Sequence, residues 1–325
     1  MNRPIVFFGA FDRHNFGDIL LGHVAAAECE AGEGTFAGLA ARDLTAWGGQ
    51  RIAALDSWPV PLNLIHVGGE LLDCYAAQAA YMLDEPGLCW RRQAPYVVAR
   101  HELPTGSVVE FRAVGGVGLD ERDVGFRAEV LAALAEAGSV SVRERTTQAL
   151  LRAAGIDAPL VPDPVTRIGE RFGARIRARI RRRDPYLAVQ FAAECADDAT
   201  LAAFARGLER LGLPVVLFRA GAALWHDALE PYRRLAARSV LPMEIFVSLD
   251  VWDICALIAG SRGYVGTSLH GRLVAEAFAV PALSLEREAG AARKLRAYLA
   301  TWSPGCVPLA PEVFADGGFI FPPSR

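Results

Sequence analysis

Short apolar runs alternate with longer segments of helical period along almost the whole chain, and this alternation constrains the fold most strongly. Strands that each lead into a helix predict a parallel sheet with helices on its faces. In the first half the predicted strands are residues 5–8, 35–39, 64–67, 96–99, 140–142 and a short 160–161. The predicted helices are residues 18–30, 70–82, 122–137 and 146–154, the last with Gly155 at its C′ position.

The second half repeats this pattern without repeating the sequence. Its predicted strands are residues 186–191, 215–218, 264–266 and 282–285. Its predicted helices are residues 199–211, 252–259, 269–278 and 291–301. No fixed period relates the halves, which argues against a solenoid. A chain of 325 residues suggests two domains of roughly 150 residues each, so we predict two Rossmann-like, doubly wound α/β domains.

The domain boundary is predicted in an arginine-rich stretch between Pro164 and Pro185. We assign residues 1–166 to an N-terminal domain, residues 167–184 to a linker and residues 185–325 to a C-terminal domain. The arginines that share one side of a helix through this linker are Arg175, Arg179, Arg182 and Arg183. Charge runs are usually solvated, so a connecting helix is favoured over an anion-binding surface. Ligands are expected in a cleft at the carboxyl ends of both sheets.

Charge and composition exclude several classes of protein. A formal net charge of −3 gives no global attraction to nucleic acid. The six cysteines form no C-x-x-C pair and have no metal-ligand spacing with the six histidines, so reduced thiols and a cytoplasmic location are expected. The first apolar run is broken at Gly9 and Asp12, too early for a signal peptide, and no run of about 18 apolar residues exists. A peripheral contact with the inner face of the membrane stays compatible with the sequence.

The loop after the first strand contains Asn15, Gly17 and Asp18, which lead into a helix. Asp18 is predicted to be the N-cap of that helix, and capping alone would explain it. Glycines in such a loop also let backbone N–H groups approach a bound anion or acceptor closely. The spacing does not match G-x-G-x-x-G, so no dinucleotide is predicted.

Two further strands of the first half end in candidate ligand contacts. Gly68 and Gly69 follow the strand that ends at residue 67, and a turn explains them at least as well as a ligand does. Arg143 follows a short buried strand by one residue. It is predicted either to close the sheet edge by an ion pair or to bind a carboxylate or phosphate with both arms of its guanidinium.

The stretch VGTSLHGRLVAEAFAVP, residues 265–281, has a histidine and an arginine where a strand leads into a helix. Thr267 or Ser268 is the predicted N-cap and Leu269 the first helical residue. His270 and Gly271 then lie in the first turn, where unbonded amides and the helix dipole favour an anion. A cation at this end opposes the dipole by about 0.3 to 1 kcal/mol, which indicates a functional reason for it.

Other cations lie farther along the chain. Most are expected to be solvated helix charges, but one of them is predicted to complete a phosphate site. They are Arg287, Arg293, Lys294 and Arg296. Trp225, His226 and Asp227 follow another strand, where a polar turn is slightly favoured over a contact with an acceptor.

Five short motifs follow one another in a characteristic order. They are N-x-G-D at 15–18, V-G-G at 67–69, S-V-R at 141–143, D-P-V at 163–165, and G-T-S-L-H-G at 266–271 with A-x-P eight residues on. Taken together they resemble the polysaccharide pyruvyl transferase family over about residues 5 to 300. The strongest segment is DVWDICALIAGSRGYVGTSLHG, residues 250–271.

The resemblance implies a glycosyltransferase-B-like pair of Rossmann-type domains. It also implies transfer of a pyruvyl group from phosphoenolpyruvate to two hydroxyls of a sugar or a lipid-linked glycan, which forms a cyclic ketal. Carried over from the family, the groups that hold the donor are Arg143, His270 and Lys294. Ser268 stands where the family pattern has an arginine, and Arg272, from the next part of the turn, is the candidate replacement.

The chemistry of this reaction requires such groups. Phosphoenolpyruvate carries a carboxylate and a phosphate, so it needs cations and helix N-termini around it. His270 is the predicted general acid toward the enol methylene, because imidazole ordinarily exchanges protons near neutral pH. Asp18 is the predicted base for a sugar hydroxyl. No cofactor and no metal is required by this scheme.

Two other functions remain open at this point. The same architecture suits a glycosyltransferase that uses a nucleotide sugar, and Glu276 or Glu286 would then bind the ribose. Alternatively, Ser268 marks a member that has lost catalysis and acts as a glycan-binding or scaffold subunit.

Overall fold

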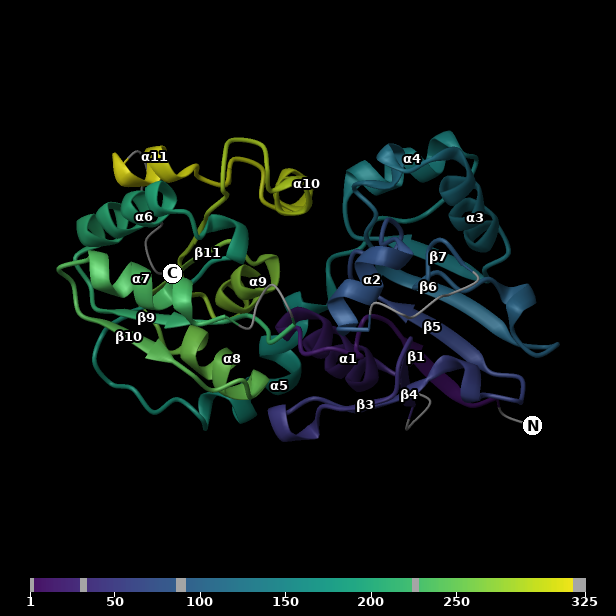
Figure 1. The fold of residues 1–325 in the computed structure, drawn as a ribbon. Helices are drawn as coiled ribbons and strands as arrows, with labels where there is room; N and C mark the ends of the chain where they lie inside the picture. The colour runs from purple at the N-terminus through teal and green to yellow at the C-terminus, as the bar shows by residue number, and fades with distance from the viewer. Residues whose placement is uncertain (1–2, 30–33, 86–91, 224–227, 318–325) are drawn as a thin grey trace. The chain divides into compact units, whose positions relative to one another are not determined.

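The computed structural model describes residues 3–29, 34–85, 92–223 and 228–317 (Figure 1). The chain divides after Pro164 into two compact units, Met1–Pro164 and Val165–Arg325. Each unit is a mixed α/β structure with a predominantly parallel sheet, as the alternation of apolar runs predicts.

Residues 167–184, assigned to a linker by sequence, belong to the second unit. Helix α5 (Ile168–Arg177) packs there against α8 and α9. The helix ends at Arg177, so of the four arginines predicted to share one helix side only Arg175 lies on α5. The prediction of one helix through all four is wrong because residues beyond 178 turn away to form ion pairs with other elements.

Within the described residues, the first unit has a seven-stranded sheet in the order β3-β4-β2-β1-β5-β6-β7, parallel except between β3 and β4. The strands are β1 (Ile5–Phe8), β2 (Thr35–Gly38), β3 (Arg42–Asp43), β4 (Arg51–Ala54), β5 (Asn63–Val67), β6 (Val108–Val114) and β7 (Ser139–Val142). The helices are α1 (Phe16–Glu28), α2 (Ala76–Leu83), α3 (Val124–Ala135) and α4 (Arg145–Ala153). Gly155, at φ 80°, follows α4 as the predicted C′ glycine.

The predicted strand at 96–99 is wrong. Residues 97–99 have no regular structure, although Val97 and Val98 are almost completely buried. Their apolar side chains resemble those of a strand, but the Val98 amide donates to the imidazole of His66 instead of to a neighbouring strand. The strand next to β5 is β6, which the pattern did not reveal because polar and apolar residues are mixed in VVEFRAV.

The second unit has, among its described residues, a five-stranded parallel sheet in the order β10-β9-β8-β11-β12. The strands are β8 (Leu187–Gln190), β9 (Val215–Phe218), β10 (Met243–Phe246), β11 (Gly263–Gly266) and β12 (Ala282–Ser284). The helices after α5 are α6 (Asp198–Leu211), α7 (Glu230–Arg238), α8 (Val251–Ala259), α9 (Leu269–Ala277), α10 (Arg293–Trp302) and α11 (Pro311–Ala315).

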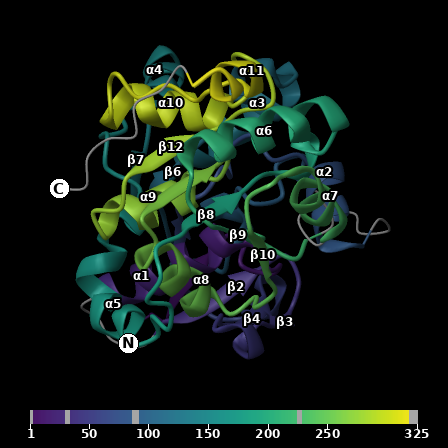
Figure 2. The same cartoon turned by 90° about the vertical axis from the view of Figure 1, so that its left-hand side faces the viewer.

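The core of the second unit fills the space between its sheet and helix α6. Helices α6 and α11 lie side by side (Figures 1 and 2), and Phe204 of α6 contacts Phe314 of α11 edge to face. Leu187 and Val189 of β8 face this cluster, and both are almost completely buried. Helices α5, α8 and α9 form a second group of mutually packed helices (Figure 1).

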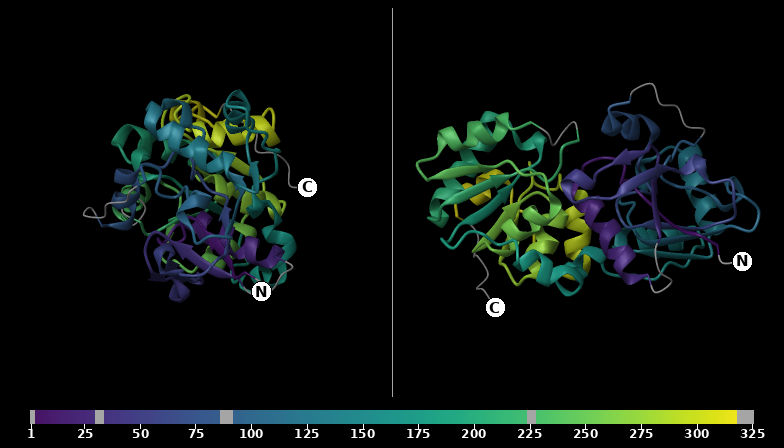
Figure 3. Two further views of the ribbon diagram at one scale, coloured as in Figure 1. Left: turned by 90° about the vertical axis from the view of Figure 1, so that its right-hand side faces the viewer. Right: turned by 90° about the horizontal axis from the view of Figure 1, so that it is seen from below.

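The order of strands reverses once near the middle of each sheet. In the first sheet β1 lies between β2 and β5, and in the second β8 lies between β9 and β11. Figure 3 shows both sheets from two further directions. Open α/β sheets bind ligands beyond the carboxyl ends of the strands at such a reversal. A ligand site is therefore expected at the loops after β1 and β5 and at those after β8 and β11.

None of the helices in the described ranges is both long enough and apolar enough to cross a membrane.

Candidate active site

Helix α9 begins at the carboxyl end of β11, beside the strand-order reversal of the second sheet. Ser268 is its N-cap, and its Oγ accepts a hydrogen bond from the Gly271 amide at 3.2 Å. Leu269 is the first helical residue, as predicted. The Gln190 side chain, at the end of β8, accepts a hydrogen bond from the Ser268 amide at 3.0 Å. These bonds fix the start of α9 to the neighbouring strand and so orient its first turn.

Gly271 is required by a close approach between α9 and the sheet. The Tyr264 hydroxyl donates to the Ser268 carbonyl at 3.2 Å. A Cβ on Gly271 would lie 2.5 Å from that hydroxyl, which no real contact tolerates. The glycine in the S-L-H-G motif thus serves the position of the helix, and its amide is bonded to the N-cap serine.

His270 is the second residue of α9, in the predicted place. Its side chain is nearly buried, with 6% of the residue exposed. First-turn amides of a helix have no intrahelical acceptor and carry the positive end of the dipole. The first turn of α9 thus brings the His270 imidazole and the amides at the positive end of the dipole together in one turn.

Arg272 lies in a different environment from the one proposed for it. Its Nε donates to Glu276 Oε1 at 2.8 Å, and its Nη1 donates to the Ala282 carbonyl at 3.3 Å and to Ser284 Oγ at 3.1 Å. The residue is 5% exposed, and these bonds connect α9 to β12. The geometry favours a structural role, so the hypothesis that Arg272 replaces the family arginine at Ser268 gains no support.

Among the cations after β12, Arg296 is paired with a carboxylate and Lys294 is exposed. Arg296 is paired with Glu286, which also accepts hydrogen bonds from the Gly290 and Ala292 amides at 3.2 and 3.3 Å. Lys294, in the first turn of α10, is exposed. The two carboxylates that would mark a nucleotide-sugar site, Glu286 and Glu276, are thus each already paired with an arginine.

The loop after β1 is capped differently from the prediction. Asn15 is the N-cap of α1, and its Oδ1 accepts hydrogen bonds from the Gly17 amide at 3.0 Å and the Asp18 amide at 3.3 Å. Asp18 lies within the first turn, so its prediction as the N-cap is wrong. The cause is that α1 starts two residues earlier than expected. The Asp18 carboxylate therefore does not cap the helix.

Arg13, which the sequence analysis did not single out, lies beside Asp18. Its Nη2 donates to Asp18 Oδ2 at 3.1 Å, and its Nη1 donates to the Tyr96 hydroxyl at 3.0 Å. The Tyr96 hydroxyl in turn donates to Asp12 Oδ1 at 2.9 Å. Burial raises the pKa of Asp12 and outweighs the opposing charge of Arg13. The signal in the sequence is the charged pair Asp12-Arg13, which begins four residues after the end of an apolar strand.

The glycine pair after β5 makes a turn with a left-handed backbone. Gly68 has φ 50° and Gly69 has φ 75°. A Cβ on Gly68 would also lie 2.6 Å from the Leu21 side chain of α1. Both glycines are therefore explained by the backbone and by the contact with α1. Their predicted contact with a ligand stays untested.

Arg143 is completely buried among three carboxylates. Its Nη2 lies 2.6 Å from Glu70 Oε2, its Nη1 2.9 Å from Asp163 Oδ2, and its Nε 3.5 Å from Glu144 Oε2. Gly115 leaves room for the cluster, since a Cβ there would lie 2.7 Å from the Glu70 carboxylate. Of the two alternatives for Arg143, the geometry favours the ion pair at the sheet edge over a bidentate contact with the donor.

Glu144 titrates abnormally in this cluster. Burial and the neighbouring Glu70 raise its pKa to about 7, although Arg143 and the Thr147 hydroxyl oppose the change. The folded protein therefore holds a proton on Glu144 that the unfolded chain loses near the ordinary pKa of 4.5. The free energy of unfolding should fall as pH rises from about 4.5 to about 7 and then level off.

We expect Glu144→Gln to remove this pH dependence. The amide stays neutral, so the variant should gain stability relative to the wild type as pH rises, on the order of 3 kcal/mol between about pH 5 and pH 8. Urea unfolding of both proteins at the two pH values measures the difference. Parallel pH profiles for the two proteins would contradict the assignment of the raised pKa to Glu144.

His226, a predicted acceptor contact, lies outside the described residues. Among the residues that the structure does describe, no group of three or more histidine, cysteine, aspartate or glutamate side chains is arranged to hold a metal ion.

Comparison with known proteins identifies both a family and a fold. The family model for polysaccharide pyruvyl transferase matches residues 40–288. No curated protein matches the chain.

Solved structures show the likeness in fold. UDP-GlcNAc 2-epimerase from Methanocaldococcus jannaschii is similar with a TM-score of 0.58 and 11% identity, over 99% of this chain and 92% of the epimerase. The UDP-GlcNAc 2-epimerase from Neisseria meningitidis bound to UDP-GlcNAc has a TM-score of 0.53 and 9% identity, over 98% and 90% of the two chains. At such identities the likeness establishes the fold alone, a pair of Rossmann-like domains of the glycosyltransferase-B type.

Proposed function

This chain belongs to the polysaccharide pyruvyl transferase family, and we propose that it moves a pyruvyl group from phosphoenolpyruvate to two hydroxyls of a sugar in a polysaccharide or glycan precursor. The observation that carries the proposal is the first turn of α9. It lies inside the matched range, at the strand-order reversal of the second sheet, and it combines a capped helix N-terminus with His270.

The reaction balances without a redox partner or a metal. Two C–O bonds form at C2 of phosphoenolpyruvate, and the C2–O bond to phosphate breaks. One hydroxyl proton of the sugar ends on the methylene carbon, which becomes a methyl group, and the other leaves with inorganic phosphate. The product is a cyclic ketal that keeps the carboxylate of the donor.

His270 is the group that we assign to proton transfer at the methylene carbon. Protonation there generates positive charge at C2, which a sugar hydroxyl then captures. The amides of the first turn of α9 bind an anionic group of the donor, because they form the positive end of the helix dipole. Lys294 is exposed at the start of α10 and supplies a further cation to the donor.

Asp18 is the group that we assign to the acceptor. Its ion pair with Arg13 holds the carboxylate in one orientation at the start of α1, with 12% of each side chain exposed. A carboxylate held in this way accepts a hydrogen bond from a sugar hydroxyl and takes its proton as the C–O bond forms. Asn15 and Gly17 lie beside it in the same capped turn.

The direct test is to incubate the protein with phosphoenolpyruvate and a panel of glycans. We expect release of inorganic phosphate that depends on one acceptor class, together with a gain of one pyruvyl ketal in the mass of that acceptor. Phosphoenolpyruvate should also raise the melting temperature. Stabilisation by uridine diphosphate but not by phosphoenolpyruvate would contradict the proposal.

Ser268 offers a test of the donor position that is independent of catalysis. Ser268→Asp keeps a good N-cap but adds a negative charge where the donor binds, so we expect the Kd for phosphoenolpyruvate to rise by about tenfold or more. Ser268→Ala is the matched control: it loses the cap, at a cost of about 1 kcal/mol in stability, without adding charge. Titration calorimetry measures the Kd for phosphoenolpyruvate in both variants. Equal donor affinities in the aspartate variant and the wild type would place the donor elsewhere.

A further inference from the structure

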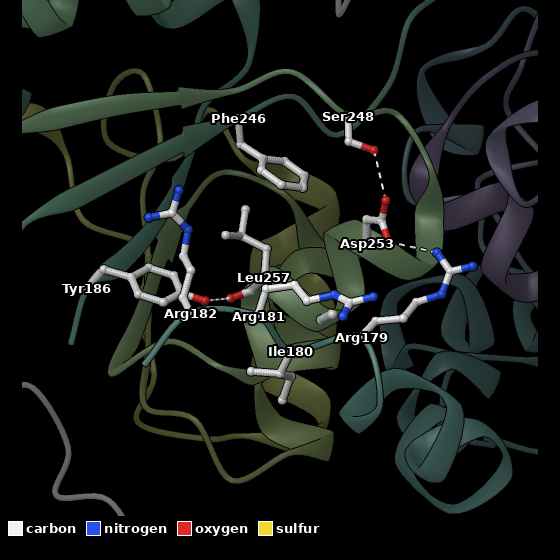
Figure 4. A pocket seen from close by; sticks show the side chains of 10 residues that line it. Arg179, Ile180, Arg181, Arg182, Tyr186, Phe246, Ser248, Asp253 and Leu257 are labelled. Carbon is white, nitrogen blue, oxygen red and sulfur yellow. Dashed lines mark hydrogen bonds and ion pairs between the residues drawn. The ribbon is translucent and has the colours of Figure 1, made fainter. Parts of the chain in front are cut away.

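Three arginines line a pocket of the second unit that the proposed reaction does not use. The pocket has a volume of about 280 Å³ and lies between residues 179–186, the end of β10 and helix α8 (Figure 4). We call it the arginine pocket and define it by Arg179, Arg181 and Arg182 together with the apolar side chains of Ile180, Phe246 and Leu257.

Arg179 is held in place but keeps donors to spare. Its Nη1 donates to Asp250 Oδ1 at 2.9 Å and to Asp253 Oδ1 at 2.7 Å, which fixes the guanidinium at the start of α8. Its Nε and Nη2 make no hydrogen bond with any other residue in the described ranges. A guanidinium carries five N–H donors, so Arg179 can bind an anion without giving up its ion pairs.

Arg182 is fixed in the same manner on the other side of the pocket. Its Nη2 donates to Glu244, and its guanidinium carbon lies 5.5 Å from the ring centroid of Tyr186. The Tyr186 hydroxyl donates to the Leu257 carbonyl at 2.6 Å, so the ring is anchored to α8. The remaining donors of Arg182 are likewise not engaged by the described part of the chain.

Arg181 is the arginine of the pocket that has no carboxylate partner among the described residues. It forms no hydrogen bond and no ion pair with the residues that the structure describes. Figure 4 shows its side chain extending toward the Arg179 side of the pocket, whereas Arg182 turns to the side of Tyr186. The other two arginines are paired with three carboxylates, those of Asp250, Asp253 and Glu244, so an anion in the pocket would pair chiefly with Arg181.

Apart from Ser248 and Asp253, which are hydrogen-bonded to each other, the rest of the pocket is lined mainly by apolar side chains. Phe246, the last residue of the edge strand β10, is half-buried, and Figure 4 shows its ring on the opposite side of the pocket from Ile180. Leu257 of α8 lies between them and is 5% exposed. An inorganic anion would leave this surface in contact with water, whereas an apolar group would gain about 25 cal/mol for each Å² it covers.

We propose that the arginine pocket binds a phosphate monoester that carries a short apolar group. The phosphate pairs with Arg181 and receives the spare donors of Arg179, because several guanidinium forks match the three oxygens of a phosphate better than the two of a carboxylate. The apolar group lies against Phe246 and Ile180. A volume of about 280 Å³ accommodates a small organic molecule of this kind.

The test is titration of the full chain with n-hexyl phosphate, followed by calorimetry. We expect saturable binding to the wild type, and a Kd raised by about tenfold in Arg181→Gln and by a similar factor in Phe246→Ala. Inorganic phosphate should bind more weakly than the ester, and hexanol should not bind. Equal affinity for inorganic phosphate and for the ester, or no saturable binding, would overturn the proposal.

Two control variants locate the site. Arg183→Gln changes an exposed arginine two positions away that does not line the pocket, and it should bind the ester as the wild type does. His270→Gln should also leave binding of the ester unchanged, so failure of the proposed donor site and failure of the arginine pocket are distinguishable. If Arg183→Gln lost as much affinity for the ester as Arg181→Gln does, the attraction would be diffuse and due to charge alone. If His270→Gln lost affinity for the ester, the ester would bind at α9.

Vesicles distinguish the two sources of such a ligand. Sedimentation with vesicles that contain phosphatidic acid, but not with phosphatidylcholine alone, would assign the pocket to a lipid headgroup if Arg181→Gln abolishes it. Binding of hexyl phosphate without binding to either vesicle would assign it to a soluble ester.

Discussion

Replacing His270 with glutamine should reduce the rate of pyruvyl transfer by about 100- to 10,000-fold, the usual contribution of general acid-base catalysis. Glutamine preserves the approximate size of the imidazole and can donate a hydrogen bond, but it cannot deliver a proton to the methylene carbon. The affinity for phosphoenolpyruvate should change far less, because the helix amides are retained. Phosphate release under saturating donor, together with calorimetric binding, separates the two quantities.

His101→Gln is the matched control for this substitution. His101 is well exposed and pairs only with Glu136 among the described residues, so its loss should leave the rate within a factor of about two. A His270→Gln variant with the wild-type rate would remove this histidine from the mechanism. A variant that loses donor affinity and rate by the same factor would show that His270 binds the donor without transferring a proton.

Replacing Arg143 with methionine should have the largest effect on stability. The substitution removes the guanidinium around which Glu70, Asp163 and Glu144 gather; Asp163 and Glu144 are almost completely buried, and the Glu70 side chain is 21% exposed. Removal of one partner from a buried ion pair costs about 3 to 5 kcal/mol. Urea unfolding near neutral pH measures the loss. Part of it should return as pH falls, because the carboxyl groups of the cluster then take up protons.

Arg51→Met provides the comparison with an exposed pair. The side chain of Arg51 is 83% exposed and pairs with Asp43, so its removal should cost no more than about 1 kcal/mol. Arg143 would instead be a donor-binding residue if Arg143→Met had normal stability and lost the thermal stabilisation by phosphoenolpyruvate. Lost stability with retained donor binding would establish the structural role that the geometry favours.

The elements that the sequence predicted well are those with a strong local signal. Strand β9 has the predicted bounds, and β1 does as well, because VVLF and IVFF are short apolar runs bounded by other residue types. Helix α9 begins at the predicted Leu269, because serine is a strong N-cap and the apolar period starts directly after it. The family was visible in the order of the motifs, and the match over residues 40–288 confirms it.

Other features depend on residues that are distant in sequence. Strand β6 pairs with β5 through a ladder that no local pattern shows, and the buried segment at 96–99 looks like a strand but is not one. His66 illustrates the same limit: it lies in a motif with glycines but is fully buried, and burial lowers its pKa to about 3. A histidine in the core and a histidine at a helix N-terminus look alike in a sequence.

The sequence by itself determined the α/β character with parallel sheets, the approximate boundary near Pro164, the capped start of α9 and the family. These follow from periodicity, capping chemistry and motif order, which act over a few neighbouring residues. Only the tertiary structure decided which arginines form ion pairs with carboxylates. Arg143 and Arg272 are bound within their units, whereas Arg181 keeps its donors, because an ion pair forms between side chains that the fold brings together from distant parts of the chain.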